Sequence, residues 1–168
     1  MRELVFDRKE WEGLLQASEA GYPREVCGLL FGPPGENPES NRVTKIALLE
    51  NILQEKHAGR LKELVARQAV ALPEERMGRG GAYEFLIDPQ EHFQKILEAQ
   101  KEGLDQVGLF HSHPDHPARP SPTDQAQPFL SGWSNIIVAV DQGKFKEARS
   151  WFRKSEDASF QEETILIK

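Results

Sequence analysis

The stretch Val107–Asp124, VGLFHSHPDHPARPSPTD, is the part of the chain around which the rest can be organised. It opens with the apolar-rich run VGLF, which leads directly to His111-x-His113 and predicts a buried strand that ends in two imidazoles. Side chains at positions i and i+2 of a strand point to the same face. The two histidines can therefore converge on one ion without a bend in the backbone.

A carboxylate follows the histidines across a stiff loop. Asp124 comes eleven positions after His113, and the loop between them contains four prolines, each of which fixes φ at about −65°. Two imidazoles and one carboxylate match a catalytic zinc site, in which the fourth position is kept for water. A closed structural site would need a fourth ligand, usually cysteine, and none is placed to serve. His111, His113 and Asp124 are therefore the candidate ligands of one zinc ion per chain.

The full pattern is His-x-His-Pro, six residues, then Ser121-x-x-Asp124, with Glu25 upstream in the segment Glu25-Val-Cys-Gly-Leu-Leu. This pattern resembles the motif of the JAMM (MPN+) zinc metalloprotease family, which has the same spacing and pairs it with a glutamate in an early strand. The resemblance extends from about Asp7 to Ile167, with no departure at the metal or acid/base positions. It identifies the chain as similar to the compact, single-domain prokaryotic members.

The resemblance implies a function as well as a site. Glu25 would be the general base that takes a proton from water and passes it to the leaving amine, and Ser121 would donate to the oxyanion. The implied substrate is the C-terminal Gly-Gly tail of a ubiquitin-like or sulfur-carrier protein, cut at an amide bond. The residues by themselves indicate only amide hydrolysis by activated water.

Composition bounds the remaining possibilities. The chain has 168 residues, with 21 basic and 27 acidic side chains and a formal net charge of −6, which argues against a surface that binds nucleic acid. We find no signal peptide in the N-terminal residues and no apolar run that approaches the roughly 18 residues of a membrane span. The single cysteine rules out an internal disulfide, so a reducing cytoplasm is the expected location. The oligomeric state stays open.

The order of predicted elements favours an α/β fold with a mixed, strongly curved β-sheet flanked by helices. The resemblance implies the same: a JAMM/MPN-like, cytidine-deaminase-like sandwich with a long helix on each side and the zinc near one edge of the sheet. The chain is expected to be one domain over residues 1–168, with a helical insertion at 54–81. We expect helices at 7–21, 88–103 and from Thr123, and strands at 26–31, 43–49, 83–87, 107–113, 136–140, 145–152 and, at an edge, 160–167.

Three alternatives remain at this point. Cys27 could be the nucleophile of a thiol hydrolase, although a lone cysteine in such an apolar context is more often a small buried hydrophobe. The chain could also be a catalytically silent scaffold or binding module of the MPN type. His116 is a tempting extra ligand, but the prolines on either side favour an exposed loop position.

Residues 54–81 carry two further open questions. The segment Gly78-Arg-Gly-Gly81 is similar to the tail of ubiquitin-like proteins and would mimic a substrate, or it is simply a flexible loop. The preceding helix would be a lid over the cleft or a surface that binds a partner, or it would be an addition to the core without a role in function.

Overall fold

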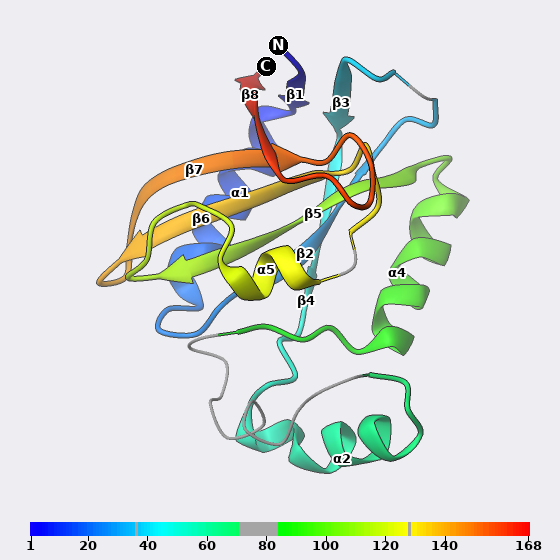
Figure 1. Ribbon diagram of the computed structural model, residues 1–168, viewed down its shortest axis with the longest axis vertical. Coiled ribbons are helices and arrows are strands. Elements are labelled where there is room, and N and C mark those ends of the chain that lie inside the picture. Colours follow the sequence, from blue (N-terminus) through cyan, green and yellow to red (C-terminus); the bar gives the residue numbers. More distant parts are fainter. Residues whose placement is uncertain (36, 71–83, 128) are drawn as a thin grey trace.

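The computed structural model describes residues 1–168 except 36, 71–83 and 128. The strands of the chain form one eight-stranded sheet, and helices lie on both of its faces (Figure 1). The elements are β1 (Glu3–Phe6), α1 (Arg8–Ala20), β2 (Cys27–Gly32), β3 (Ser40–Val43), β4 (Lys45–Leu49), η1 (Glu55–His57), α2 (Ala58–Ala66), α4 (Pro89–Lys101), β5 (Asp105–Pro114), α5 (Pro122–Ala126), β6 (Ser134–Asp141), β7 (Lys144–Phe152) and β8 (Gln161–Ile167).

The strand order is β3-β1-β8-β7-β6-β5-β2-β4, and the sheet is mixed. β5 and β6 are parallel, β1 is parallel to both β3 and β8, and the remaining neighbours are antiparallel. β3 and β4 form the two ends of this order, yet only Thr44 separates them in the chain. The sheet must therefore curl until its two ends meet, which confirms the strongly curved α/β fold expected from the sequence.

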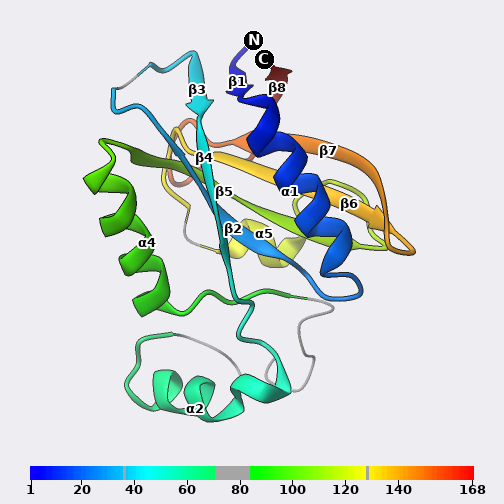
Figure 2. The same ribbon diagram turned by 180° about the vertical axis from the view of Figure 1, so that it is seen from behind.

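Successive side chains of a strand point to opposite faces of the sheet, so the strand residues divide into two sets. Leu30 of β2 and Phe110 of β5 point to one face and pack with Leu14 of α1. Leu29 and its neighbours at i±2 point to the other face and pack with Ala99 of α4. Figure 1 and Figure 2 accordingly show α1 on one side of the sheet and α4 and α5 on the other. Apolar residues on both faces are thus buried, as the near-continuous apolar run of β2 requires.

Three strand assignments made from the sequence were wrong. The predicted edge strand at 160–167 is instead the internal strand β8, because the N-terminal strand β1, which was not predicted, pairs with it in parallel. The predicted strand at 83–87 is not formed by the described residues 84–87, of which only Ile87 makes an isolated bridge, to Asn51. The single predicted strand at 43–49 is divided at Thr44 into β3 and β4, which belong to opposite ends of the sheet.

The expected insertion at 54–81 is described up to Val70. Its helix α2 ends at Ala66, and Gln68 has a φ of 57°. Leu61 and Leu64 pack in a small cluster of their own with Ile52 and Leu53. The Gly78–Gly81 segment lies outside the described residues, and the assignment of a single domain with an insertion stays a prediction.

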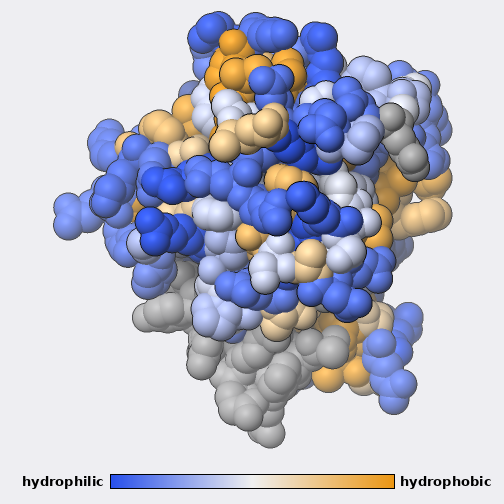
Figure 3. Space-filling model, turned by 45° about the horizontal axis from the view of Figure 1, so that its top comes forward, coloured by the Kyte–Doolittle hydropathy of each residue, from blue (hydrophilic) through white to orange (hydrophobic). Residues whose placement is uncertain are grey.

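Hydrophilic side chains cover most of the face shown in Figure 3, and the apolar ones form small separate groups among the atoms that are not grey. None of the helices in the described part of the chain combines the length and the apolar character that a bilayer span requires.

Candidate metal centre

The two histidines lie on one face of a central strand. β5 is hydrogen-bonded to β2 on one side and to β6 on the other, so its backbone is fixed by both neighbours. His111 and His113 follow Leu109 at intervals of two and share its face of the sheet, on the side of α4. Their exposed fractions are 1% and 6%, and their Nε2 atoms are 3.1 Å apart. Both rings therefore present the same nitrogen to one buried point.

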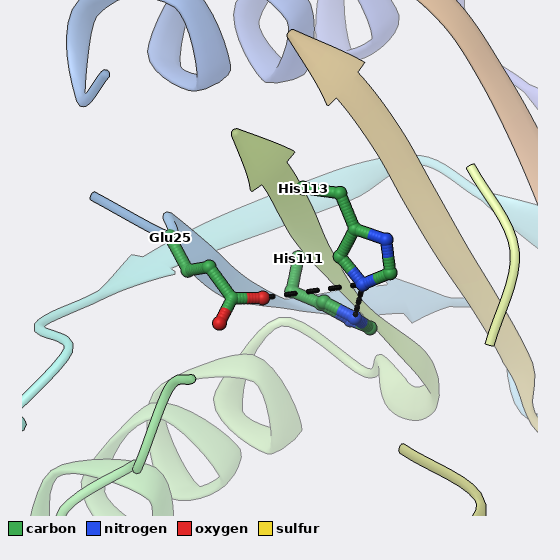
Figure 4. Close-up of side chains that lie close together, drawn as sticks. All are labelled: Glu25, His111 and His113. Atoms are coloured by element: carbon green, nitrogen blue, oxygen red, sulfur yellow. Dashed lines mark hydrogen bonds and ion pairs between the residues drawn. The ribbon is translucent and has the colours of Figure 1, made fainter. Parts of the chain in front are cut away.

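Glu25 reaches this point from the residues just before β2. Register places Cys27 opposite His111, so the chain two residues earlier lies beside the end of β5. The Glu25 carboxylate turns toward the histidines, with Oε1 4.0 Å from Nε2 of His113 (Figure 4). Ligand atoms of Glu25, His111 and His113 all lie within 4.8 Å of one another, and all three residues are buried.

Asp124 comes from the short helix α5. Ser121 is the N-cap of this helix: its Oγ accepts the Asp124 N–H at 3.1 Å, and the Asp124 carboxylate accepts the Ser121 N–H at 2.8 Å. This capping box fixes the direction of the aspartate side chain. Asp124 Oδ1 lies 3.2 Å from His111 Nε2, and Oδ2 lies 3.1 Å from His113 Nε2. The structure thus brings together all four residues predicted to bind zinc or to activate water, and Ser121 lies next to Asp124 in the capping box.

One hydrogen bond settles the tautomer of His113. Its Nδ1 lies 2.8 Å from the carbonyl oxygen of Pro117, and because a carbonyl can only accept, Nδ1 must carry the hydrogen. A neutral His113 then presents the lone pair of Nε2 to the cluster. Metal-binding histidines commonly donate their other N–H to a carbonyl in this way.

Burial and neighbouring charges perturb the pKa values of the whole group. Burial raises the pKa of Glu25 to about 8. Burial would also raise the pKa of Asp124, but the two histidines and the Ser121 N–H hold it well below the usual carboxyl range. Burial lowers the pKa of His111, whereas hydrogen bonding to Asp124 and Pro117 overcomes burial and raises that of His113. Strongly shifted pKa values, some raised and some lowered, within one buried cluster are typical of a functional site.

The donor set fits a zinc ion. Zinc bonds of 2.0–2.1 Å in a tetrahedron place neighbouring ligand atoms about 3.3 Å apart, and the two Nε2 atoms and the Asp124 oxygens are separated by 3.1–3.2 Å. Lone pairs and a carboxylate that face one another at this distance repel unless a cation or a proton lies between them. Glu25 is more distant, and its buried Oε2 has no hydrogen-bond partner among the described residues. That oxygen could accept a proton from a bound molecule.

Other candidates from the sequence lie outside the cluster. His116 is exposed, as its position between prolines predicted. The Cys27 thiol is fully buried among apolar side chains, where burial raises its pKa well above the usual thiol range. The two remaining histidines, which were not candidates, also lie elsewhere: His57 is near Glu50, and His92 is hydrogen-bonded to Gln106.

Three residues that support the cluster were missed by sequence reasoning. The ring of Phe85 stacks on His111 with centroids 4.7 Å apart. The hydroxyl of Ser112 accepts the Val26 N–H at 2.8 Å and so holds the residue next to Glu25. Asn51 donates to the backbone carbonyl of Glu25 at 3.0 Å. None carries a local signal, because each acts through contacts between distant parts of the chain.

Comparison with known proteins gives consistent matches. A family model described as prokaryotic homologs of the JAB domain matches residues 8–154. A desampylase from Pyrococcus furiosus is 30% identical over 123 residues, which are 73% of this chain and 64% of that protein. A desampylase from Haloferax volcanii is 30% identical over 120 residues, which are 71% of this chain and 65% of that protein. The match thus spans slightly less than two thirds of the length of each of these curated relatives.

A solved structure agrees with the fold. A protein from Desulfitobacterium hafniense, determined in solution, superposes with a TM-score of 0.70 at 25% identity, covering 98% of this chain and 92% of that one.

Proposed function

Because the chain belongs to the prokaryotic JAB family, a branch of the JAMM/MPN proteins, we propose that it is a zinc-dependent isopeptidase. It would hydrolyse an amide bond at the C-terminal Gly-Gly tail of a ubiquitin-like or sulfur-carrier protein. The observation that carries this proposal is the convergence of Glu25, His111, His113 and Asp124 on one buried point. The two desampylase relatives support the choice of a ubiquitin-like substrate class.

In this proposal His111, His113 and Asp124 hold one zinc ion per chain. When bound, zinc supplies a Lewis acid that polarises the scissile carbonyl and makes a water molecule nucleophilic near neutral pH. The capping box of α5 keeps the Asp124 carboxylate directed at the two imidazoles, and the Pro117 carbonyl keeps His113 in the required tautomer. These contacts hold the ligands in place before any substrate arrives.

Glu25 performs the proton transfers. Its carboxylate faces the histidines, and its unpaired Oε2 can accept the proton of the attacking water. The same group then delivers that proton to the departing amine, so that no charge is left on the leaving group. Burial raises the pKa of this carboxyl, and a carboxyl with a raised pKa is suited to accept a proton and to return it.

Ser121 stabilises the oxyanion. Its Oγ accepts the Asp124 N–H, which leaves the hydroxyl hydrogen able to donate to a carbonyl oxygen as negative charge develops on it. The N-cap hydrogen bond holds the Ser121 oxygen in place, and its hydroxyl hydrogen can turn toward that carbonyl.

Two observations weigh against the other functions considered. A Cys27 nucleophile would need a thiolate at neutral pH, and complete burial disfavours the charged form. A metal-free scaffold has no need of a buried cluster of two imidazoles and two carboxylates, whose burial is costly without a cation. Both observations favour the zinc hydrolase.

The test is cleavage of a ubiquitin-like fusion that ends in Gly-Gly-X, with products assigned by mass spectrometry. We expect a cut after the second glycine, loss of activity with a chelator, recovery with zinc, and resistance to iodoacetamide. Glycine suits this position because only a residue without a side chain passes easily between a metal and its base. Replacing the second glycine with valine should lower kcat/KM by about 100-fold. Equal rates on the two fusions, or cuts elsewhere, would rule out the Gly-Gly tail as the substrate.

A further inference from the structure

Asn51 is a buried amide two residues beyond β4, with an exposed fraction of 4%. Its Nδ2 donates to two backbone carbonyl oxygens, that of Glu25 at 3.0 Å and that of Glu84 at 2.9 Å. Its Oδ1 accepts the N–H groups of Leu53 at 3.2 Å and Leu86 at 3.1 Å. One side chain thus joins three separate segments of the chain.

The segments that Asn51 joins are those that shape the candidate metal centre. One contains Glu25, the proposed base. Another contains Phe85, whose ring stacks on the proposed ligand His111. The side chain of Asn51 supplies hydrogen bonds that a regular strand would provide, because the described residues 84–87 make only one isolated bridge, between Ile87 and Asn51 itself.

The backbone on the other side of Glu25 is also fixed. The Val26 N–H donates to Ser112 Oγ, and the Ser112 N–H donates to the Val26 carbonyl, each at 2.8 Å. Ser112 lies between the two histidines on β5, so this contact ties Val26 to the strand that bears them. Without Asn51, the Glu25 carbonyl would lose its hydrogen bond to Nδ2, and the backbone would be held only on the Val26 side of Glu25.

We propose that Asn51 is a positioning residue, which holds Glu25 and the Phe85 segment in one fixed arrangement around the metal pocket. The inference rests on the proposed function, because it assigns Glu25 the role of base. Asn51 would act through its hydrogen bonds to the backbone of Glu25, Leu53, Glu84 and Leu86 rather than by contact with the reacting atoms. An asparagine suits the role because its amide provides two donors and an acceptor on one short side chain.

Asn51→Asp removes the donors and nearly preserves the volume. The new carboxylate would face the carbonyl oxygens of Glu25 and Glu84, so both bonds to them are lost at neutral pH, whereas the bonds from Leu53 and Leu86 can persist. Asn41→Asp is a matched control. The Asn41 amide also donates to two backbone carbonyls, of Val107 at 3.2 Å and Gly132 at 2.9 Å, but Asn41 lies on β3, at the opposite end of the strand order from β4.

Both variants are compared with the wild type as zinc-loaded proteins, by zinc content, steady-state kinetics on a Gly-Gly-X fusion, and NMR amide shifts. We expect Asn51→Asp to keep one zinc and to lower kcat at least about 10-fold, since small misplacements of a catalytic group are costly, with KM changed by less than about threefold. The amide signals of Glu25 and Phe85 should shift. Asn41→Asp should leave kcat and both signals as in the wild type.

A kcat within about twofold of the wild type in Asn51→Asp, or an equal loss of kcat in Asn41→Asp, would overturn the proposal. If the wild-type protein cuts no such fusion, the proposed function fails, and the NMR signals still decide the positioning role: unchanged Glu25 and Phe85 signals in Asn51→Asp refute it.

Hydrogen exchange on the wild type covers the case in which Asn51→Asp does not fold. The amide hydrogens of Leu53 and Leu86 should be protected, because a buried acceptor binds both. Exchange of these two amides at the rate of an unstructured chain would show that Asn51 does not hold the segments together.

Discussion

Zinc should raise the melting temperature of this protein, and His113→Ala should remove most of that rise. His113 Nε2 lies 3.1 Å from both His111 Nε2 and Asp124 Oδ2, so its removal takes away one of three converging donors. The remaining imidazole and carboxylate would bind zinc far more weakly, because a catalytic site relies on three protein ligands.

The expected size follows from linkage. A ligand at about 100 times its Kd stabilises the folded state by about 2.7 kcal/mol. For a chain of this length each kcal/mol shifts Tm by about 2–4 °C. Zinc in such excess should therefore raise the Tm of the wild type by about 5–11 °C, and that of His113→Ala by much less.

The measurement is scanning calorimetry of the wild type and the variant, each with a chelator and with excess zinc. His116→Ala is the control, since it makes the same change three residues later at an exposed histidine, and it should keep the full rise. An undiminished rise in His113→Ala would show that zinc binds elsewhere. A rise that is also lost in His116→Ala would show that the effect is not specific to the cluster.

Three further predictions concern Ser121, Gly108 and Asp88. Ser121→Ala should lower kcat about 100-fold or more through loss of the oxyanion donor and lower the free energy of unfolding by about 1 kcal/mol through loss of the N-cap. Ser121→Thr keeps the hydroxyl, so kinetics and urea unfolding should show most of the kcat and most of the stability restored. Gly108→Ala should destabilise the folded protein by about 3 kcal/mol or prevent folding, because the added Cβ would meet a backbone oxygen of β6 at 1.9 Å. Gly59→Ala in α2 is the control: its Cβ would meet nothing within 4 Å, so this variant should be neutral or stabilising in the same unfolding assay. The pKa of Asp88 is lowered by its hydrogen bond from Arg60. The contribution of the Asp88 carboxylate to folding stability is therefore present at neutral pH and is lost as the pH falls through the folded-state pKa. Asp88→Asn should reduce the loss of stability between about pH 7 and pH 3, and an unchanged dependence of stability on pH would contradict this.

The candidate set of His111, His113 and Asp124 was accessible from the sequence because its spacing is local, whereas the contact of Asp124 with the two histidines is tertiary. Two residues on one strand share a face whatever the rest of the fold does. Asp124 lies in a capping box with Ser121, and that motif is also local. Their roles as ligands and as oxyanion donor stay predictions, as does the role of Glu25, until zinc content and kinetics are measured.

The missed features depend on contacts between segments far apart in the chain. β1 has only four residues, and it is a strand because β3 and β8 accept it on both sides. That pairing turned the expected edge strand β8 into an internal one. The apolar residues near Phe85 suggested a strand, yet Asn51 organises this segment through its side chain, and no periodicity reveals such an interaction.

The most direct test of the central claim is the cleavage of a Gly-Gly-X fusion by zinc-loaded wild type and zinc-loaded Glu25→Gln, measured side by side with zinc content. Glu25 Oε1 is 4.0 Å from His113 Nε2, farther than the Asp124 oxygen, so we expect the variant to keep its zinc. Its turnover should fall by at least about 100-fold, because the group that moves the proton is gone. Near-normal turnover in the variant would contradict the account, and loss of zinc would make Glu25 a ligand rather than the base.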